Sequence, residues 1–160
     1  FKADIDLERN GGGLILDTNI SQNKVFNYRL NLGYYKYEHK YPLAVTQEHK
    51  YYTLDNTFGF GIVRTENIRL WAGPMIGFGY AKTTESDINY SEITFCFGGV
   101  FGLNAHLSSA LSLGITLGIK SEYLVGSEET SSKEIVYSGN FGGYYANIAL
   151  LYRLDSDLYK

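Results

Sequence analysis

The stretch FNYRLNLGY, residues 26–34, decides the fold class. Its even-numbered residues, from Phe26 to Tyr34, are apolar or aromatic, whereas its odd-numbered residues are polar or glycine. A period of two places successive side chains on opposite faces of a β-strand. The pattern therefore predicts an all-β protein, and five further segments repeat it: Tyr52–Ile62, Ile68–Tyr80, Ile93–Leu107, Leu111–Tyr123 and Tyr144–Leu154.

Two more strands are expected at the N-terminus. Asn10-Gly11 favours a two-residue type I′ hairpin turn, which would pair Arg9 with Gly12. The eight expected strands are joined by connections of alternating length, and this alternation predicts a closed, antiparallel, up-and-down barrel in a single domain, 1–160. The expected short connections are 21–24, 65–67 and 108–110, and the longer ones are 41–47, 83–90 and 126–135.

Composition excludes several classes of protein. The chain has 160 residues, with 15 Tyr, 9 Phe and 18 Gly, a composition typical of strands. Its net charge of -3 and scattered basic residues argue against nucleic-acid binding. The single cysteine, Cys96, excludes an internal disulfide framework. No apolar run is long enough for a membrane helix, and no signal segment opens the chain, so we expect any export signal to have been removed.

The positions of the glycines indicate which face of the barrel points inward. Glycine on the exterior of a soluble strand weakens the strand and covers nothing, whereas inside a narrow barrel it leaves room for long polar side chains. Eleven glycines lie on the polar face, so this face is predicted to point inward and the apolar face to point outward. The glycines are Gly33, Gly59, Gly61, Gly73, Gly77, Gly79, Gly98, Gly102, Gly114, Gly118 and Gly143.

The apolar face fits exposure to lipid. A tilted membrane strand needs about 9 to 11 residues, which each full-length segment supplies. Aromatic residues near both ends of the segments predict the girdles of a transmembrane barrel, whereas the opposite facing would give a soluble, lipocalin-like ligand-binding barrel. The predicted girdle residues are Phe26, Tyr34, Tyr52, Tyr80, Tyr123, Tyr144 and Tyr152.

The pattern of WAGPMIGFGYA (71–81) and ANIALLYRL (146–154) resembles strands of the small eight-stranded outer-membrane barrels of Gram-negative bacteria, the group of OmpX, the OmpA transmembrane domain and the opacity proteins. The resemblance covers the whole chain and implies a transmembrane barrel in the bacterial outer membrane. Members usually finish on an aromatic residue, whereas this chain continues past Leu154 with DSDLYK.

A polar network is expected in the lumen. The turn at 21–24 would place Asp17 directly opposite Arg29, and enclosed charges are costly unless they are paired. We therefore expect Arg29, Lys120 and Arg153 to pair with carboxylates among Asp6, Glu8, Asp17, Asp55 and Glu122. The expected role is a plug that holds the barrel closed, with a narrow solute path or a pH-sensitive gate as the alternative. The predicted network is Asp17, Arg29, Asp55, Lys120, Glu122, Arg153 and His106.

His106-Leu107-Ser108 matches the His-x-Ser spacing of the outer-membrane lipid A deacylases, which this chain resembles in strand pattern. The expected topology, however, places this triplet at a periplasmic turn, far from outer-leaflet lipid. A nucleophile without a base in reach is not activated. We therefore expect no catalytic residues and no enzymatic activity, with His106 as a hydrogen-bonding residue of the lumen.

The triplet Glu-His-Lys occurs twice, at 38–40 and 48–50. Pairing Tyr37 with Tyr51 would set opposite charges across a surface hairpin and bring the two histidines face to face. A metal ion between the histidines would lack good further ligands, so no metal or other cofactor is expected. The surface hairpin is predicted to present Glu38, His39, Lys40, Glu48, His49 and Lys50 above the membrane, with its lysines facing lipopolysaccharide phosphates.

These expectations combine into one leading function, a non-enzymatic outer-membrane barrel, expected to be monomeric. Its surface loops would serve envelope integrity, adhesion or interaction with partners. The expected partners are membrane lipid and lipopolysaccharide, with a host or other surface protein contacting the loops. A narrow, porin-like channel or hydrophobic-solute conduit is the alternative.

Overall fold

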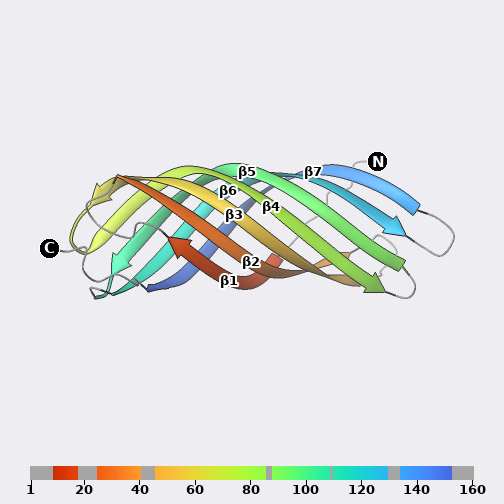
Figure 1. Ribbon diagram of the computed structural model, residues 1–160, viewed down its shortest axis with the longest axis horizontal. Helices are drawn as coiled ribbons and strands as arrows, with labels where there is room; N and C mark the ends of the chain where they lie inside the picture. Colours follow the sequence, from red (N-terminus) through yellow and green to blue (C-terminus); the bar gives the residue numbers. More distant parts are fainter. Residues whose placement is uncertain are drawn as a thin grey trace.

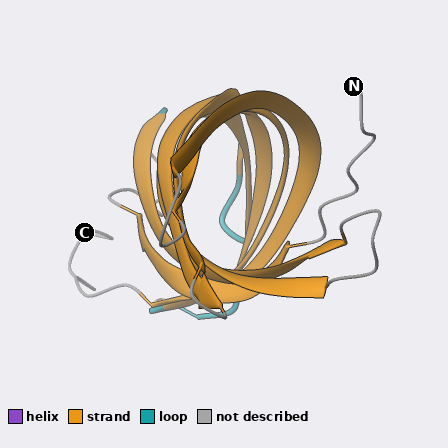
Figure 2. Ribbon diagram, turned by 90° about the vertical axis from the view of Figure 1, so that its right-hand side faces the viewer, coloured by secondary structure: helices purple, strands orange, loops and turns teal. Residues whose placement is uncertain are grey.

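The computed structural model describes residues 9–17, 25–40, 46–85, 88–108, 110–129 and 134–152. These residues form one antiparallel sheet of seven strands, whose spatial order follows the sequence, as predicted for an up-and-down topology. The sheet curls strongly about an interior (Figures 1 and 2). The strands are β1 (Arg9–Asp17), β2 (Phe26–Lys40), β3 (Thr46–Arg64), β4 (Ile68–Glu85), β5 (Ile88–His106), β6 (Leu111–Glu129) and β7 (Glu134–Tyr152).

Side chains that meet across the interior show how strong the curl is. Arg29 on β2 donates a hydrogen bond to Thr116 on β6 at 2.9 Å. Arg9 on β1 donates to Glu122, also on β6, at 2.6 Å. Neither pair of strands is adjacent in the sheet. Side chains from non-adjacent strands therefore meet within the concave face.

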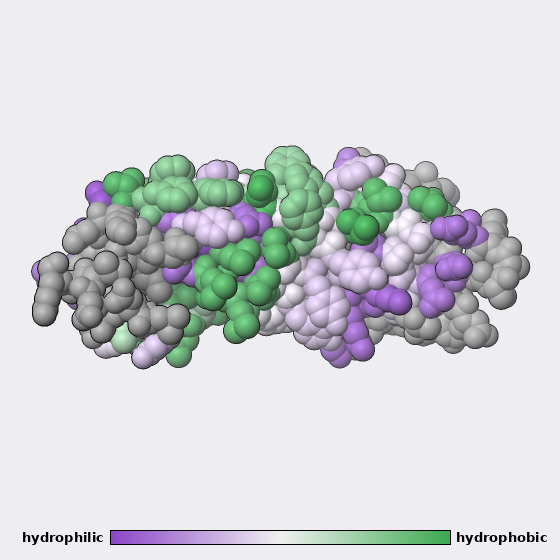
Figure 3. All heavy atoms as spheres, viewed as in Figure 1, coloured by the Kyte–Doolittle hydropathy of each residue, from purple (hydrophilic) through white to green (hydrophobic). Residues whose placement is uncertain are grey.

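The polar face points inward and the apolar face outward, as the alternation predicted. Asn27 and Arg29 are buried, whereas Phe26, Phe60 and Ile76 are exposed. On the side shown in Figure 3, hydrophobic residues gather on the half of the wall nearer the short turns, and hydrophilic residues on the other half. A polar interior with an apolar exterior is the reverse of the arrangement in a soluble ligand-binding barrel, which needs an apolar interior.

The six alternating segments lie almost entirely within β2 to β7, and two predicted short turns are confirmed. The turn at 65–67 is closed by a hydrogen bond from the Thr65 amide to the Ile68 carbonyl at 2.9 Å. The turn after β5 is closed by a bond from the Leu107 amide to the Leu111 carbonyl, also at 2.9 Å. The expected turn at 21–24 lies outside the described residues.

The predicted hairpin at Asn10-Gly11 is wrong. Both residues lie within β1, where Asn10 pairs with Lys36 and Gly11 with Tyr35. Strand β2 continues to Lys40, so every residue in the N-terminal half of β1 has a pairing partner on β2. A continuous ladder satisfies more backbone groups than a tight turn here, and the glycines can adopt the extended conformation. The strand expected before Asn10 lies mostly in residues 1–8, which are outside the described part of the chain.

The predicted register of the β2–β3 hairpin is wrong by two residues. Tyr35, not Tyr37, pairs with Tyr51, and Phe26 pairs with Phe60. Aromatic contacts accompany this register: the rings of Phe26 and Phe60 lie 5.6 Å apart. A shift of two residues keeps every side chain on its face, so the alternation alone could not detect the error.

Three connections are shorter than expected, because the strands continue where the alternation fades. Strands β4 and β5 pair as far as Glu85 and Ile88, and β6 and β7 as far as Glu129 and Glu134. Strand β3 already begins at Thr46. The sheet therefore extends well beyond the apolar part of its wall at the end that carries these connections.

The two edge strands remain separate within the described residues. No ladder there joins β1 to β7, and an odd number of antiparallel strands makes these two run in the same direction. The described residues contain no helix long and apolar enough to cross a membrane.

Candidate functional site: the polar interior

The lowest layer of the interior, nearest the short turns, is centred on Arg29. Its guanidinium forms an ion pair with Asp17, with Nη2 and Oδ2 2.8 Å apart, and the pair is nearly inaccessible to solvent. The same guanidinium donates to Thr116 and Asn104 and lies over the Trp71 ring, 4.5 Å from its centroid. The predicted pairing of Asp17 with Arg29 is confirmed, both in register and as an ion pair. One residue thus connects five of the seven strands.

A second arginine, Arg69, extends this layer. It is fully buried and donates a hydrogen bond to the Asn27 side chain at 3.3 Å. Asn27 in turn donates to Asp17 at 3.5 Å, so both arginines are linked to the same carboxylate. The sequence interpretation missed Arg69, although it lies on the same face as Trp71 in β4 and the period of two could have revealed it.

The middle layer is mostly apolar. Trp71, Met75, Cys96 and Val100 form a buried cluster against which Tyr145 packs. The Tyr145 hydroxyl donates to the Met75 sulfur at 3.3 Å, which connects β7 to β4 across the interior. Asp55 lies at its border and is buried, with the Cys96 thiol 3.7 Å from its carboxylate.

The upper layer is a cluster of three charges. The Glu122 carboxylate accepts two hydrogen bonds from Arg9, at 2.6 and 2.8 Å, and also forms an ion pair with Lys120. Arg9 additionally lies over the ring of Tyr51, 4.4 Å from its centroid. The predicted pairing of Lys120 with a carboxylate is confirmed. Arg9 was missed because it was assigned to a turn, while Arg153, Asp6 and Glu8 lie outside the described residues.

Together, the three layers fill the interior with paired charges, hydrogen bonds and rings. Buried ion pairs that are also hydrogen-bonded fix the relative positions of the strands from which their side chains come. Several inward glycines make the necessary room. At Gly102 and at Gly79 a Cβ atom would overlap the side chains of Trp71 and Tyr51 respectively. This arrangement can lock strands together.

His106 lies at the end of β5, and its Nδ1 is 2.8 Å from the Ser112 hydroxyl. This contact confirms the predicted hydrogen-bonding role. Ser108, the other member of the His-x-Ser triplet, uses its hydroxyl to accept hydrogen bonds from the amides of Ala110 and Leu111, at 3.3 and 3.1 Å. The side chain thus caps a turn.

At the opposite end of the interior, His49 is buried, with its Nδ1 3.1 Å from the Thr83 hydroxyl and its ring against Tyr90. The two histidines of the repeated triplet are not opposite one another, because His39 pairs with Gln47 and His49 with Tyr37. The predicted face-to-face pairing of the two histidines is therefore wrong.

The predicted charge pairs of this hairpin are wrong for the same reason. Glu38 pairs with Glu48 rather than Lys50, and Lys40 pairs with Thr46. Lys50 is exposed and lies opposite Lys36. Within the described part of the chain, no group of three or more His, Cys, Asp or Glu residues is placed to hold a metal ion.

The predicted girdle residues all lie exposed on the outward face. Tyr34, Tyr52 and Tyr80 are direct neighbours across β2, β3 and β4, with the rings of the first two 5.3 Å apart. Tyr123 and Tyr144 lie lower along β6 and β7, where they pair with Phe95 and Ile119. Such a stagger is expected for strands that tilt against the axis of a curled sheet. Phe26 and Tyr152 lie at the end nearer the short turns.

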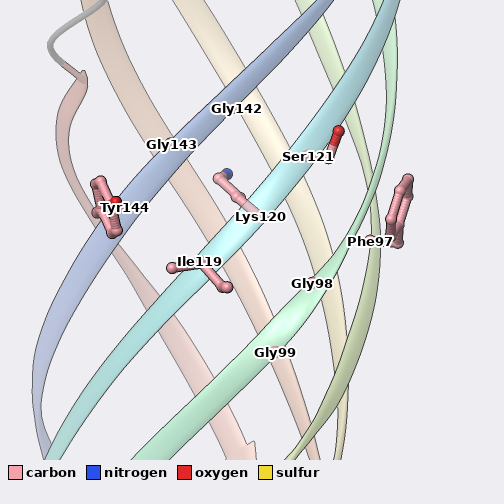
Figure 4. A pocket seen from close by; sticks show the side chains of 9 residues that line it. All are labelled: Phe97, Gly98, Gly99, Ile119, Lys120, Ser121, Gly142, Gly143 and Tyr144. Atoms are coloured by element: carbon pink, nitrogen blue, oxygen red, sulfur yellow. The ribbon is translucent and has the colours of Figure 1, made fainter.

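A hollow of about 590 Å³ lies in the wall formed by β5, β6 and β7 (Figure 4). Exposed Phe97, Ile119 and Tyr144 surround it. Glycines form much of its floor, since Gly98 and Gly143 flank Lys120 on the two neighbouring strands. The sequence interpretation did not foresee it, because it is formed by residues that are adjacent only across the sheet.

No protein-family model matches the chain. No curated protein and no solved structure matches it either.

Proposed function

We propose that this chain is a non-enzymatic, integral β-barrel protein of a bacterial outer membrane, of the small eight-stranded kind. Its wall would span the bilayer, and the strand extensions and connections at one end would contact partners at the cell surface. The observation that carries this proposal is the arrangement of its two faces. Large apolar side chains cover the outside, whereas Arg29, Asp55 and Glu122 are buried inside.

The dimensions of the apolar wall support insertion into a bilayer. In β3, the outward face is apolar or aromatic from Tyr52 to Ile62 with the exception of Asn56, a span of eleven residues. A tilted strand needs about 9 to 11 residues to cross the hydrocarbon core. Asn56 accepts a hydrogen bond from the Tyr28 hydroxyl on the same face, which lowers the cost of placing an amide there. The row of tyrosines marks the upper border of this belt, as an interfacial girdle would.

Membrane insertion also requires closure of the sheet. In lipid, an unpaired backbone amide or carbonyl costs several kcal/mol, which is why sheets cross membranes only as closed barrels. Because β1 and β7 run in the same direction, one additional strand between them would be antiparallel to both. We therefore propose an eighth strand that completes the barrel.

Hydrogen exchange tests closure. In a closed barrel, the outer-edge amides of β1 and β7 should exchange as slowly as those of β4, which has a neighbour on both sides. The protein would be refolded in detergent micelles and followed residue by residue by NMR. Rapid exchange confined to β1 and β7 would argue for an open sheet.

A matched pair of lysine substitutions tests membrane insertion. Phe97 is 58 % exposed in the middle of the apolar wall, while Asn140 is exposed on β7 above it. In a bilayer, Phe97→Lys should cost about 2–4 kcal/mol, because a lysine near the midplane meets hydrocarbon. Asn140→Lys should cost little. The measurement is flotation of refolded protein with phosphatidylcholine vesicles, in which wild type and Asn140→Lys should float and Phe97→Lys should float poorly.

The opposite result would support a water-soluble barrel. In that case, the wild-type chain would remain in solution without detergent, and Phe97→Lys would improve its solubility, because it would remove an exposed aromatic ring. Either finding would contradict the proposed membrane location.

A further inference from the structure

Three exposed lysines form a continuous row across the outward face of the sheet. Lys36 on β2 pairs directly with Lys50 on β3, and Lys50 pairs directly with Lys82 on β4. Neighbouring strands are about 4.8 Å apart, so the row is only about 10 Å wide. Like charges directly opposite one another destabilise a sheet. An anion bound across the row would therefore reduce the repulsion between neighbouring lysines.

The position of this lysine row indicates which kind of anion it would bind. Each lysine is two residues from the corresponding member of the row formed by Tyr34, Tyr52 and Tyr80, and both rows are exposed on the same face. In membrane barrels, tyrosines of this kind lie at the level where acyl chains meet headgroups. The lysines, one step further out, would then lie at the level of the headgroup phosphates.

Neighbouring strands extend the lysine row with hydrogen-bonding side chains. Asn10 on β1 pairs with Lys36, and Ser91 on β5 pairs with Lys82. The hydroxyl of Ser91 lies 3.0 Å from that of Ser127 on β6. Amide and hydroxyl groups can donate to phosphate oxygens alongside the ammonium groups.

Acidic residues lie on the other side of the lysine row. Two residues further along β2 and β3, away from the tyrosines, Glu38 pairs with Glu48. By strand position, the lysine row therefore lies between these acidic residues and the tyrosine row, and the adjacent tyrosines favour a lipid headgroup as the source of the anion.

We infer that the row of Lys36, Lys50 and Lys82 binds the phosphate groups of anionic lipids in the leaflet on the side of the longer connections. The inference rests on the proposed membrane insertion. It deepens that proposal by naming the group that is bound and the residues that bind it. Phosphomonoester headgroups should bind best, because they carry the most negative charge in the smallest volume.

Native mass spectrometry of the refolded full chain tests this inference, with phosphatidic acid and phosphatidylcholine as the two lipid probes. Wild type should retain phosphatidic acid in preference to phosphatidylcholine. The triple variant K36Q/K50Q/K82Q should lose this preference by about a hundredfold, since each lysine near a membrane surface contributes about a fivefold effect. High salt should weaken the wild-type preference.

Two control variants test whether lipid binding depends on positive charge at these three positions or only on the net charge of the protein. K36R/K50R/K82R keeps the charges and should retain most of the preference. R64Q removes one exposed positive charge at the opposite end of the wall and should leave the preference unchanged. Far-UV circular dichroism would verify that each variant is folded. The glutamine variant is expected to fold because it removes repulsion between like charges.

The outcomes distinguish the two proposals. If wild type and the glutamine variant retain phosphatidic acid equally, the lysine row is not a lipid site, although the protein still floats with vesicles. If inorganic phosphate at millimolar concentration displaces the lipid completely, the row takes free phosphate and the lipid assignment fails. Failure of wild type to float at all would instead overturn the proposed function.

Discussion

At the scale of single residues, the inward glycines are the most direct test of how the interior is packed. A Cβ atom at Gly102 would overlap the indole of Trp71, which is fully buried. Gly102→Ala should therefore destabilise the protein by about 1–3 kcal/mol, the usual cost of overpacking. Gly99, on the same strand, has open space where its Cβ would be, so Gly99→Ala is the matched control. Urea unfolding in detergent would measure both; equal stabilities would show that Trp71 does not need the glycine.

The buried ion pair is testable at the same scale. Asp17→Asn leaves the Arg29 charge enclosed without its carboxylate and should cost about 3–5 kcal/mol. Adding Arg29→Met to that variant should recover part of the loss, because the unpaired charge is removed. Arg64→Met, at an exposed position, should change the free energy of unfolding by less than about 1 kcal/mol. A loss for Asp17→Asn no greater than that of Arg64→Met would refute the role of the pair in holding the wall together.

At the scale of elements, the β2–β3 register can be tested by cross-linking. In a Cys96→Ser background, Lys36→Cys with Lys50→Cys should form a disulfide readily, because these residues are directly opposite. Lys36→Cys with Tyr52→Cys should form one slowly, because Tyr52 is opposite Tyr34. Direct partners have Cβ atoms about 5 Å apart and diagonal ones about 7–8 Å, whereas a disulfide needs about 4 Å. Oxidation followed by mass spectrometry would decide, and faster closure of the second pair would favour the register two residues away.

The bounds of the strands show where the alternation of polar and apolar residues no longer predicts secondary structure. The alternation located the central parts of β2 to β7, because burial of one face imposes the period of two. It did not locate their upper ends, where Lys82 pairs with Ser91 and neither residue reveals a buried face. It also suggested a turn at Asn10-Gly11, since a local dipeptide preference does not record that β2 continues alongside it.

At the scale of the whole molecule, the filled interior predicts a protein that does not conduct ions. In planar bilayers, wild type should show no stable conductance steps, because Arg29 occupies the lower interior, Trp71 the middle and the Arg9–Glu122 pair the upper. Removing the largest side chains, as in Arg29→Ala with Trp71→Ala, should raise the frequency of openings. Phe97→Ala, on the outward face, should stay silent. Steady conductance by wild type would favour the alternative, a narrow channel.

Sequence alone determined the fold class, the direction in which each face points, and the pairing of Asp17 with Arg29. These features follow from period-two alternation and from residues close in the chain, where few geometries are available. The contacts across the interior, Arg9 with Glu122 and Arg29 with Thr116, and the register that aligns Lys36, Lys50 and Lys82 on neighbouring strands came only from the tertiary structure. The physical reason is that a two-residue shift leaves every face unchanged but changes every neighbour, so cross-strand and cross-interior partners depend on the register and curl of the whole sheet.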